Sequence, residues 1–225
     1  MTSKSGNLQP LSIKDCAILN IATGARAKNL KELRDRLLTI HPESITYHFW
    51  AKRLRPGLQE PEYNNDFAAW AYTNLHDNKL AERLGLINPG IFSDTKELRA
   101  KVIQIVELCL EENETTLDAK EGEQFHFIRS EITLFDTQNV ISKPEELTEL
   151  LPDLSLGSIY FHFIDARYGS KYESSNISLW ISGFGADYKE LSEQISKLDP
   201  YFFTLIEFRA RVSQLFKDYF KGAVN

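Results

Sequence analysis

Ser44-Ile45-Thr46-Tyr47-His48-Phe49 is the stretch that decides the fold, because it returns 114 positions later as Ser158-Ile159-Tyr160-Phe161-His162-Phe163. Further blocks recur in the same order, and their separation falls to 110 positions where the first copy carries a longer loop between Arg53 and Trp70. Matched blocks in one order indicate an internal duplication. The other matched blocks are Arg53 with Arg167, Asp66–Trp70 with Asn176–Trp180, Leu80–Pro89 with Leu191–Pro200, and Glu97–Ala100 with Glu207–Ala210.

A polar, acidic stretch separates the two copies. Residues 111–124 read EENETTLDAKEGEQ, a composition typical of a linker. The resulting division of the chain is a flexible N-terminus over 1–10, a first repeat unit over 11–112, an acidic linker over 113–123 and a second repeat unit over 124–225.

The last helix of each unit is predicted by the spacing of its apolar residues. They recur at intervals of 4, 3, 1 and 3, which places them on one face of a helix. A D-x-x-E box precedes the first stripe and a T-x-x-E box the second, and such boxes favour a helix start. The stripes are Leu98, Val102, Ile105, Val106 and Cys109, and then Phe208, Val212, Leu215, Phe216 and Tyr219.

Shorter elements are expected before each stripe. Asn29 with Glu32, and Ser142 with Glu145, indicate helix starts. One short extended segment is predicted in each copy from its strand-forming residues, and the two segments could pair. The further helices are predicted over 43–54, 157–168, 67–76 and 78–84, and the extended segments within 12–21 and 125–135.

The predicted fold class is mainly α, with α+β possible if the extended segments form a small sheet. A unit of about 100 residues buries only a modest fraction of its surface by itself. We therefore predict two pseudo-symmetric helical repeats packed on each other as an internal pseudo-dimer.

Composition argues against several classes of function. The formal net charge is −6 over 225 residues, and acidic and basic residues alternate, so neither nucleic-acid binding nor a polybasic membrane anchor is expected. No segment approaches the roughly 18 apolar residues of a membrane span, and a polar start without a signal core predicts a cytoplasmic protein. Cys16 and Cys109 form no CxxC pair, which favours reduced, buried thiols.

His48 and His162 are the first candidates for chemistry. Each lies in an apolar helical segment, so we expect a packed ring with hydrogen-bonded nitrogens, and a general base or metal ligand is the alternative. A zinc site formed by His48, His162 and Asp66 would lack its carboxylate in the second copy, where Asn176 stands. No HxxxH or HExxH spacing occurs, so we predict no metal and no cofactor.

The remaining candidates come in matched pairs. Asp66 and Asn176 are expected to cap helices, and Trp70 and Trp180 to lie in the core, with ligand contact or sugar stacking as the alternatives. Arg53 and Arg167 are expected to pair with Glu97 and Glu207, or else to bind an anion. The candidate ligand-binding residues are His48, Arg53, Asp66, Trp70, His162, Arg167, Asn176 and Trp180.

The blocks S-I-x-x-H-F (Ser44–Phe49), D-F-x-x-W (Asp66–Trp70) and E-L-R-A (Glu97–Ala100) resemble a family of bacterial and archaeal proteins known only as a domain of unknown function. The resemblance covers nearly the whole chain. It brings no catalytic residues with it, and a location of members near genes for carbohydrate-active enzymes would imply a link with sugar metabolism. The second copy departs from the pattern at Asn176 and Phe208.

We therefore expect a cytoplasmic ligand-binding or regulatory protein without catalytic activity, whose partner is a small molecule or a protein. Two alternatives stay open. The first is a hydrolase or carbohydrate-processing enzyme with a site at the interface between repeats. The second is a structural subunit of a larger assembly, which would show a large exposed apolar patch.

Overall fold

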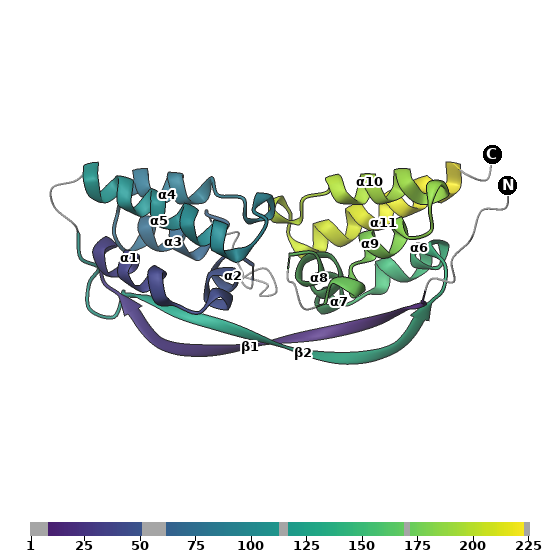
Figure 1. Ribbon diagram of the computed structural model, residues 1–225, viewed down its shortest axis with the longest axis horizontal. Coiled ribbons are helices and arrows are strands. Elements are labelled where there is room, and N and C mark those ends of the chain that lie inside the picture. Colours follow the sequence, from purple (N-terminus) through teal and green to yellow (C-terminus); the bar gives the residue numbers. More distant parts are fainter. Residues whose placement is uncertain (1–8, 51–61, 113–116, 169–171, 223–225) are drawn as a thin grey trace. The chain divides into compact units, whose positions relative to one another are not determined.

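Two long strands form the sheet of this protein. The computed structural model describes residues 9–50, 62–112, 117–168 and 172–222. Strand β1 (Leu11–Ala27) pairs with β2 (Phe125–Ile141), and Figure 1 shows the two running in opposite directions. The predicted pairing of two extended segments is confirmed, although each strand has 17 residues and is longer than expected. The extra length was not predicted because polar residues such as Arg129 and Glu131 interrupt the strand-forming pattern.

A residue with a positive φ angle follows a threonine at matched places in the two strands. Thr23 Oγ1 donates to the Phe127 carbonyl at 2.7 Å, and Thr137 Oγ1 donates to the Ile13 carbonyl at 2.6 Å. The residue after each threonine has a positive φ, 77° at Gly24 and 63° at Gln138. Glycine adopts this left-handed conformation freely, whereas a residue with a Cβ pays about 1–2 kcal/mol for it.

Helices make up most of the described chain, which confirms the mainly α class. The first set follows β1: α1 (Leu30–Thr39), α2 (Pro42–Trp50), α3 (Asp66–Thr73), α4 (Asn78–Gly85), the 3₁₀ turn η2 (Pro89–Ile91) and α5 (Thr95–Glu112). The second set follows β2: η3 (Pro144–Glu146), α6 (Leu147–Leu150), η4 (Leu151–Asp153), α7 (Leu156–Tyr160), the π-helical turn η5 (Phe161–Asp165), α8 (Ala166–Tyr168), η6 (Glu173–Ser175), α9 (Ile177–Ser182), η7 (Ala186–Tyr188), α10 (Lys189–Lys197), η8 (Pro200–Phe202) and α11 (Leu205–Gly222).

The chain divides into two compact units that share the strands. One, here called the central unit, is Ile18–Ile132, and the other, the terminal unit, comprises Met1–Ala17 and Thr133–Asn225. Both crossings of the chain between units therefore fall inside β1 and β2. Each unit contains part of each strand, so the spatial units differ from the repeats seen in the sequence. Pseudo-symmetry and the packing of a pseudo-dimer stay predictions.

The two predicted apolar stripes are buried within these units. All five stripe residues of α5 are buried, and α5 packs on α1, α2 and α4 of the central unit. In α11, Phe208, Val212 and Phe216 are buried while Leu215 and Tyr219 are half-buried. Helix α11 packs on α6, α7 and α10 of the terminal unit. The stripes therefore supply the core of each unit.

Two of the predicted helix starts have different outcomes. Asn29 caps α1, since its side chain accepts from the Glu32 N–H and the Glu32 carboxylate accepts from the Lys28 N–H. The prediction for Ser142 is wrong, because Lys143 is the N-cap residue of η3 and makes no side-chain cap bond. The Glu146 carboxylate, rather than Glu145, accepts from the Ser142 N–H.

No helix within the described residues is long and apolar enough to cross a membrane.

Candidate functional site

His48 is a residue of helix α2 and is buried against strand β2 in the central unit. Its ring is 2% exposed. Nδ1 lies 3.0 Å from Asp66 Oδ2, and Nε2 accepts from the Ile128 backbone N–H at 3.2 Å. Because Nε2 accepts, the ring proton belongs on Nδ1, which donates to the carboxylate. Burial lowers the pKa of His48, and the bond to Asp66 opposes that shift only in part.

His162 occupies the corresponding place in the terminal unit. Its ring is fully buried in the π-helical turn η5. Nε2 accepts from the Lys14 backbone N–H at 3.0 Å, and Nδ1 donates to the Ser175 carbonyl at 2.7 Å. Burial lowers the pKa of His162 to about 4, so the ring is neutral at neutral pH.

The two histidines have the same structural role. Each ties its helix to a backbone N–H of the ribbon, and the two N–H groups, of Lys14 and Ile128, are 114 positions apart, as are His48 and His162. A general base needs a free lone pair directed at a substrate. Both ring nitrogens of each histidine are already bonded within the protein, which is the packed-histidine arrangement.

Asp66 does not cap helix α3, contrary to expectation. The cap is the neighbouring Asn65, which is fully buried; its Oδ1 accepts from the Ala68 N–H at 2.9 Å and its Nδ2 donates to the Leu84 carbonyl at 3.0 Å. Asp66 is the first helical residue and turns its carboxylate to His48. In the terminal unit Asn176 caps α9 as predicted, accepting from the Leu179 N–H.

The matched tryptophans lie in the core of their units. Trp70 is 6% exposed and Trp180 is 7% exposed. Trp70 Nε1 donates to the Glu123 carbonyl, and Trp180 Nε1 donates to the Gln9 carbonyl. Each indole therefore holds the segment just before a strand, and neither offers an open face for stacking a sugar.

Arg53 lies outside the described residues. Arg167 donates to the carbonyls of Ser196 and Leu198 at the end of α10. It does so in place of the predicted pairing with Glu207, whose carboxylate accepts from Thr204 in the capping box. No sequence pattern predicts this role, because every residue carries the same backbone carbonyl acceptor.

The next candidate sites in the described part of the chain are metal-ligand clusters and the buried thiol of Cys16. No group of three or more His, Cys, Asp and Glu side chains there could hold a metal ion. Cys16 is buried, and burial, with the charges of Asp165 and Asp15, raises the pKa of its thiol to about 12. Such a thiol is a poor nucleophile at neutral pH.

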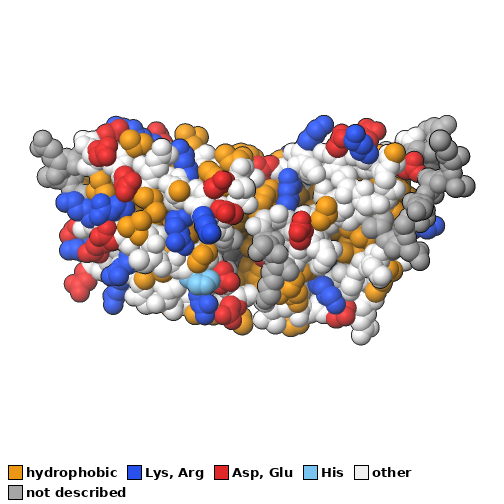
Figure 2. Space-filling view, in the orientation of Figure 1, with side chains coloured by type: hydrophobic (Ala, Val, Ile, Leu, Met, Phe, Trp, Pro, Cys, Tyr) orange, Lys and Arg blue, Asp and Glu red, His pale blue; other side chains and the backbone are white. Residues whose placement is uncertain are grey.

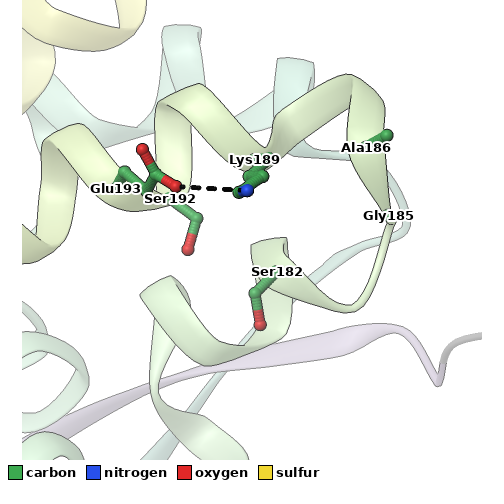
Figure 3. A pocket seen from close by; sticks show the side chains of 6 residues that line it. All are labelled: Ser182, Gly185, Ala186, Lys189, Ser192 and Glu193. Atoms are coloured by element: carbon green, nitrogen blue, oxygen red, sulfur yellow. Dashed lines mark ion pairs between the residues drawn. The ribbon is translucent and has the colours of Figure 1, made fainter.

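Two shallow pockets lie in the terminal unit. One, of about 330 Å³, lies between α9 and α10, where Lys189 pairs with Glu193 at 3.8 Å, as Figure 3 shows. The other, of about 310 Å³, runs along α11 beside Pro152. Neither pocket is lined by any of the eight candidate ligand-binding residues. On the face drawn in Figure 2, acidic and basic side chains are interspersed.

The comparisons with known proteins place this chain in a family. A model described as a family of unknown function, DUF5752, matches residues 8–217. The chain belongs to that family. This confirms the resemblance drawn from the repeated blocks to a family known only as a domain of unknown function.

One solved structure shares the fold of this family member. It is described as the structure of OrfY from Thermoproteus tenax, with a TM-score of 0.78 and 20% sequence identity, and the match covers 93% of this chain and 95% of that one. At that identity the likeness is one of fold. No curated protein matches the chain.

Proposed function

We propose that this family member is a cytoplasmic ligand-binding or regulatory protein without catalytic activity. The observation that supports it is the bonding of His48 and His162 at both ring nitrogens. These were the side chains best suited to acid–base catalysis near neutral pH, and both serve to fasten helices to the ribbon. These bonds favour a non-catalytic role over the hydrolase alternative, in which the same rings would act as the general base.

We further propose that the two repeats are pseudo-symmetric and exchange strands. In support, matched residues make matched contacts within each unit. Arg99 donates to the Ile40 carbonyl and Arg209 to the Leu154 carbonyl, both at 2.6 Å. The histidine, tryptophan and threonine contacts described above form three more such pairs. In each histidine pair the helix belongs to one repeat and the strand to the other.

A panel of nitrophenyl esters, phosphates and glycosides tests the proposed function. We expect the wild-type protein to show no turnover that His48→Gln or His162→Gln reduces. We expect both variants to unfold at a lower temperature, because a buried N–H loses its acceptor. Turnover that disappears in a variant still folded by circular dichroism would instead establish an enzyme.

A second candidate, a subunit of a larger assembly, is favoured by two exposed apolar residues. Ile91 at the end of η2 is 74% exposed, and Phe202 at the end of η8 is 63% exposed. Each lies two residues after a buried proline and is the last residue of its three-residue turn, at matched places. Isolated exposed apolar residues are common, but a repeated one suits contact with protein.

Light scattering at rising concentration tests this candidate. For an assembly of identical chains we expect a mass that grows with concentration and a reversal in the double variant Ile91→Ser, Phe202→Ser. A constant monomer mass in the wild-type protein would exclude self-assembly through these residues.

A further inference from the structure

One face of helix α11 borders an open pocket of about 310 Å³. The pocket-lining residues of α11 are spaced 3, 1, 3, 1 and 3 apart, so they lie on one side of the helix. Pro152 of η4 supplies the opposite wall. The α11 residues are Ile206, Arg209, Ala210, Ser213, Gln214 and Lys217.

Two cationic donors, Arg209 and Lys217, are among the polar residues that line this pocket. Arg209 uses Nη1 for the Leu154 carbonyl and carries further N–H groups on its guanidinium. Within the described residues, no ion pair joins Lys217 to a carboxylate. The Ser213 hydroxyl is bonded to the Arg209 carbonyl, and Gln214 Nε2 to Asp218 Oδ1 at 2.7 Å. The pocket thus holds two cationic side chains, with Asp218 as a carboxylate beside Gln214.

The corresponding face of α5 shows which of these residues the shared scaffold requires. Arg99 stands where α11 has Arg209 and bonds a carbonyl in the same way. Ile103 stands in place of Ser213, and Glu107 in place of Lys217. Because α5 forms its helix with Ile103 and Glu107 at these positions, the scaffold shared by the two repeats does not require Ser213 or Lys217.

An apolar side completes the pocket. Ile206 is 57% exposed, and Pro152 and Ala210 add further carbon surface. Ligand pockets commonly combine an apolar wall with a few polar groups that fix orientation, and they begin at about 300 Å³. Cationic side chains that recognise phosphate or carboxylate form charge-assisted hydrogen bonds with it.

We propose that the α11 face of the terminal unit binds a small organic anion. Its phosphate or carboxylate group contacts Arg209 and Lys217, and its short apolar part lies against Ile206 and Pro152. The proposal rests on the proposed function, since it names the class of ligand for a binding protein. On the matched face of α5, Glu107 would repel the anion, so we expect no binding at that face.

Titration calorimetry of the full chain at low salt tests the site with three probes: phenyl phosphate, benzoate and inorganic phosphate. We expect phenyl phosphate or benzoate to bind one equivalent, and their relative affinity shows which head group is preferred. We expect inorganic phosphate to bind more weakly, because it lacks the apolar part. The substitution Lys217→Glu, which copies Glu107, should weaken binding by at least about tenfold, the loss of one charge-assisted hydrogen bond. Lys189→Glu in the other pocket is the matched control and should leave affinity unchanged.

Several results would overturn the anion site. They are no binding of either organic probe to the wild-type protein, equal affinity in the wild-type protein and Lys217→Glu, an equal loss in Lys189→Glu, or equal affinity for inorganic phosphate. Lys217 is half-buried on the surface of α11, so its replacement should leave the fold intact, and a thermal melt checks this. These failures would leave the non-catalytic function standing, whereas histidine-dependent turnover would remove that function and leave the anion site.

Discussion

The Nε2 atom of His162 accepts a hydrogen bond from the backbone N–H of Lys14, 148 residues earlier in the chain. The bond joins the π-helical turn of the terminal unit to the first residues of β1. An acceptor is needed there because an N–H without a partner is costly when buried. A protonated imidazole cannot accept, so this contact makes the stability of the fold depend on pH.

We expect the free energy of unfolding to fall as the pH drops from about 6.5 to about 4. The folded pKa of His162, about 4, lies below the unfolded value, so the unfolded chain binds more protons in that window. The loss should reach roughly 3 kcal/mol for this group. Urea titrations at several pH values should show that the free energy of unfolding depends less steeply on pH in His162→Gln than in the wild-type protein. The same pH dependence of stability in the wild-type protein and His162→Gln would contradict this prediction.

Gly157 at the start of α7 should tolerate no side chain. A Cβ there would lie 2.2 Å from Asp15 Oδ1 and 2.4 Å from the Cys16 carbonyl oxygen. We expect Gly157→Ala to destabilise the protein by about 2 kcal/mol or more, because the helix would have to move off the strand. Gly222→Ala, where nothing lies within 4 Å, should change stability by less than about 0.5 kcal/mol. Equal thermal melts for the two variants would contradict the close approach.

The two asparagine caps should differ in their contribution to stability. Asn65→Ala removes a cap bond and one of two donors to the Leu84 carbonyl, which also accepts from the Ile87 N–H. Because Asn65 is fully buried, we expect a loss of about 2 kcal/mol. Asn176→Ala removes a cap bond from a half-buried residue, and a loss of about 1 kcal/mol is expected. Chemical denaturation measures both, and a larger effect at Asn176 would contradict this ranking.

Cys16 should be unreactive in the folded protein. Its Sγ donates to the Gly157 carbonyl at 3.3 Å, and its pKa of about 12 leaves almost no thiolate at pH 8. In a Cys109→Ala background, we expect a disulfide reagent to modify Cys16 only after unfolding in urea. Rapid labelling of the native protein would show that the strand–helix contact opens.

The sequence predicted those features that follow from local patterns. The stripe on α5, the Asn29 cap and the Asn176 cap depend on neighbours within a few residues, and all are present in the structure. The repeated block also pointed to His48 and His162 as packed rings. Local pattern could not reveal that the ring acceptors serve Ile128 and Lys14, because those contacts join residues 80 and 148 positions apart.

Other features were missed for identifiable reasons. The sequence does not distinguish Asn65 from Asp66 as the cap of α3, because both residue types are good caps and the longer first-copy loop makes the repeat alignment ambiguous beside them. The strands were predicted too short because the ribbon alternates exposed and half-buried residues over much of its length. The pocket on α11 had no motif, since Arg209 and Lys217 stand out only when α5 and α11 are compared position by position.

The passage of the chain between units inside β1 and β2 has a consequence for fragments. If the backbone were cut between α5 and β2, each of the two pieces would retain the helices of one unit and lack strand residues that complete it. The pieces should therefore reassemble when mixed, and neither should fold cooperatively by itself. In this respect the chain should behave like a split protein, because each half supplies strand residues that the other half needs to fold.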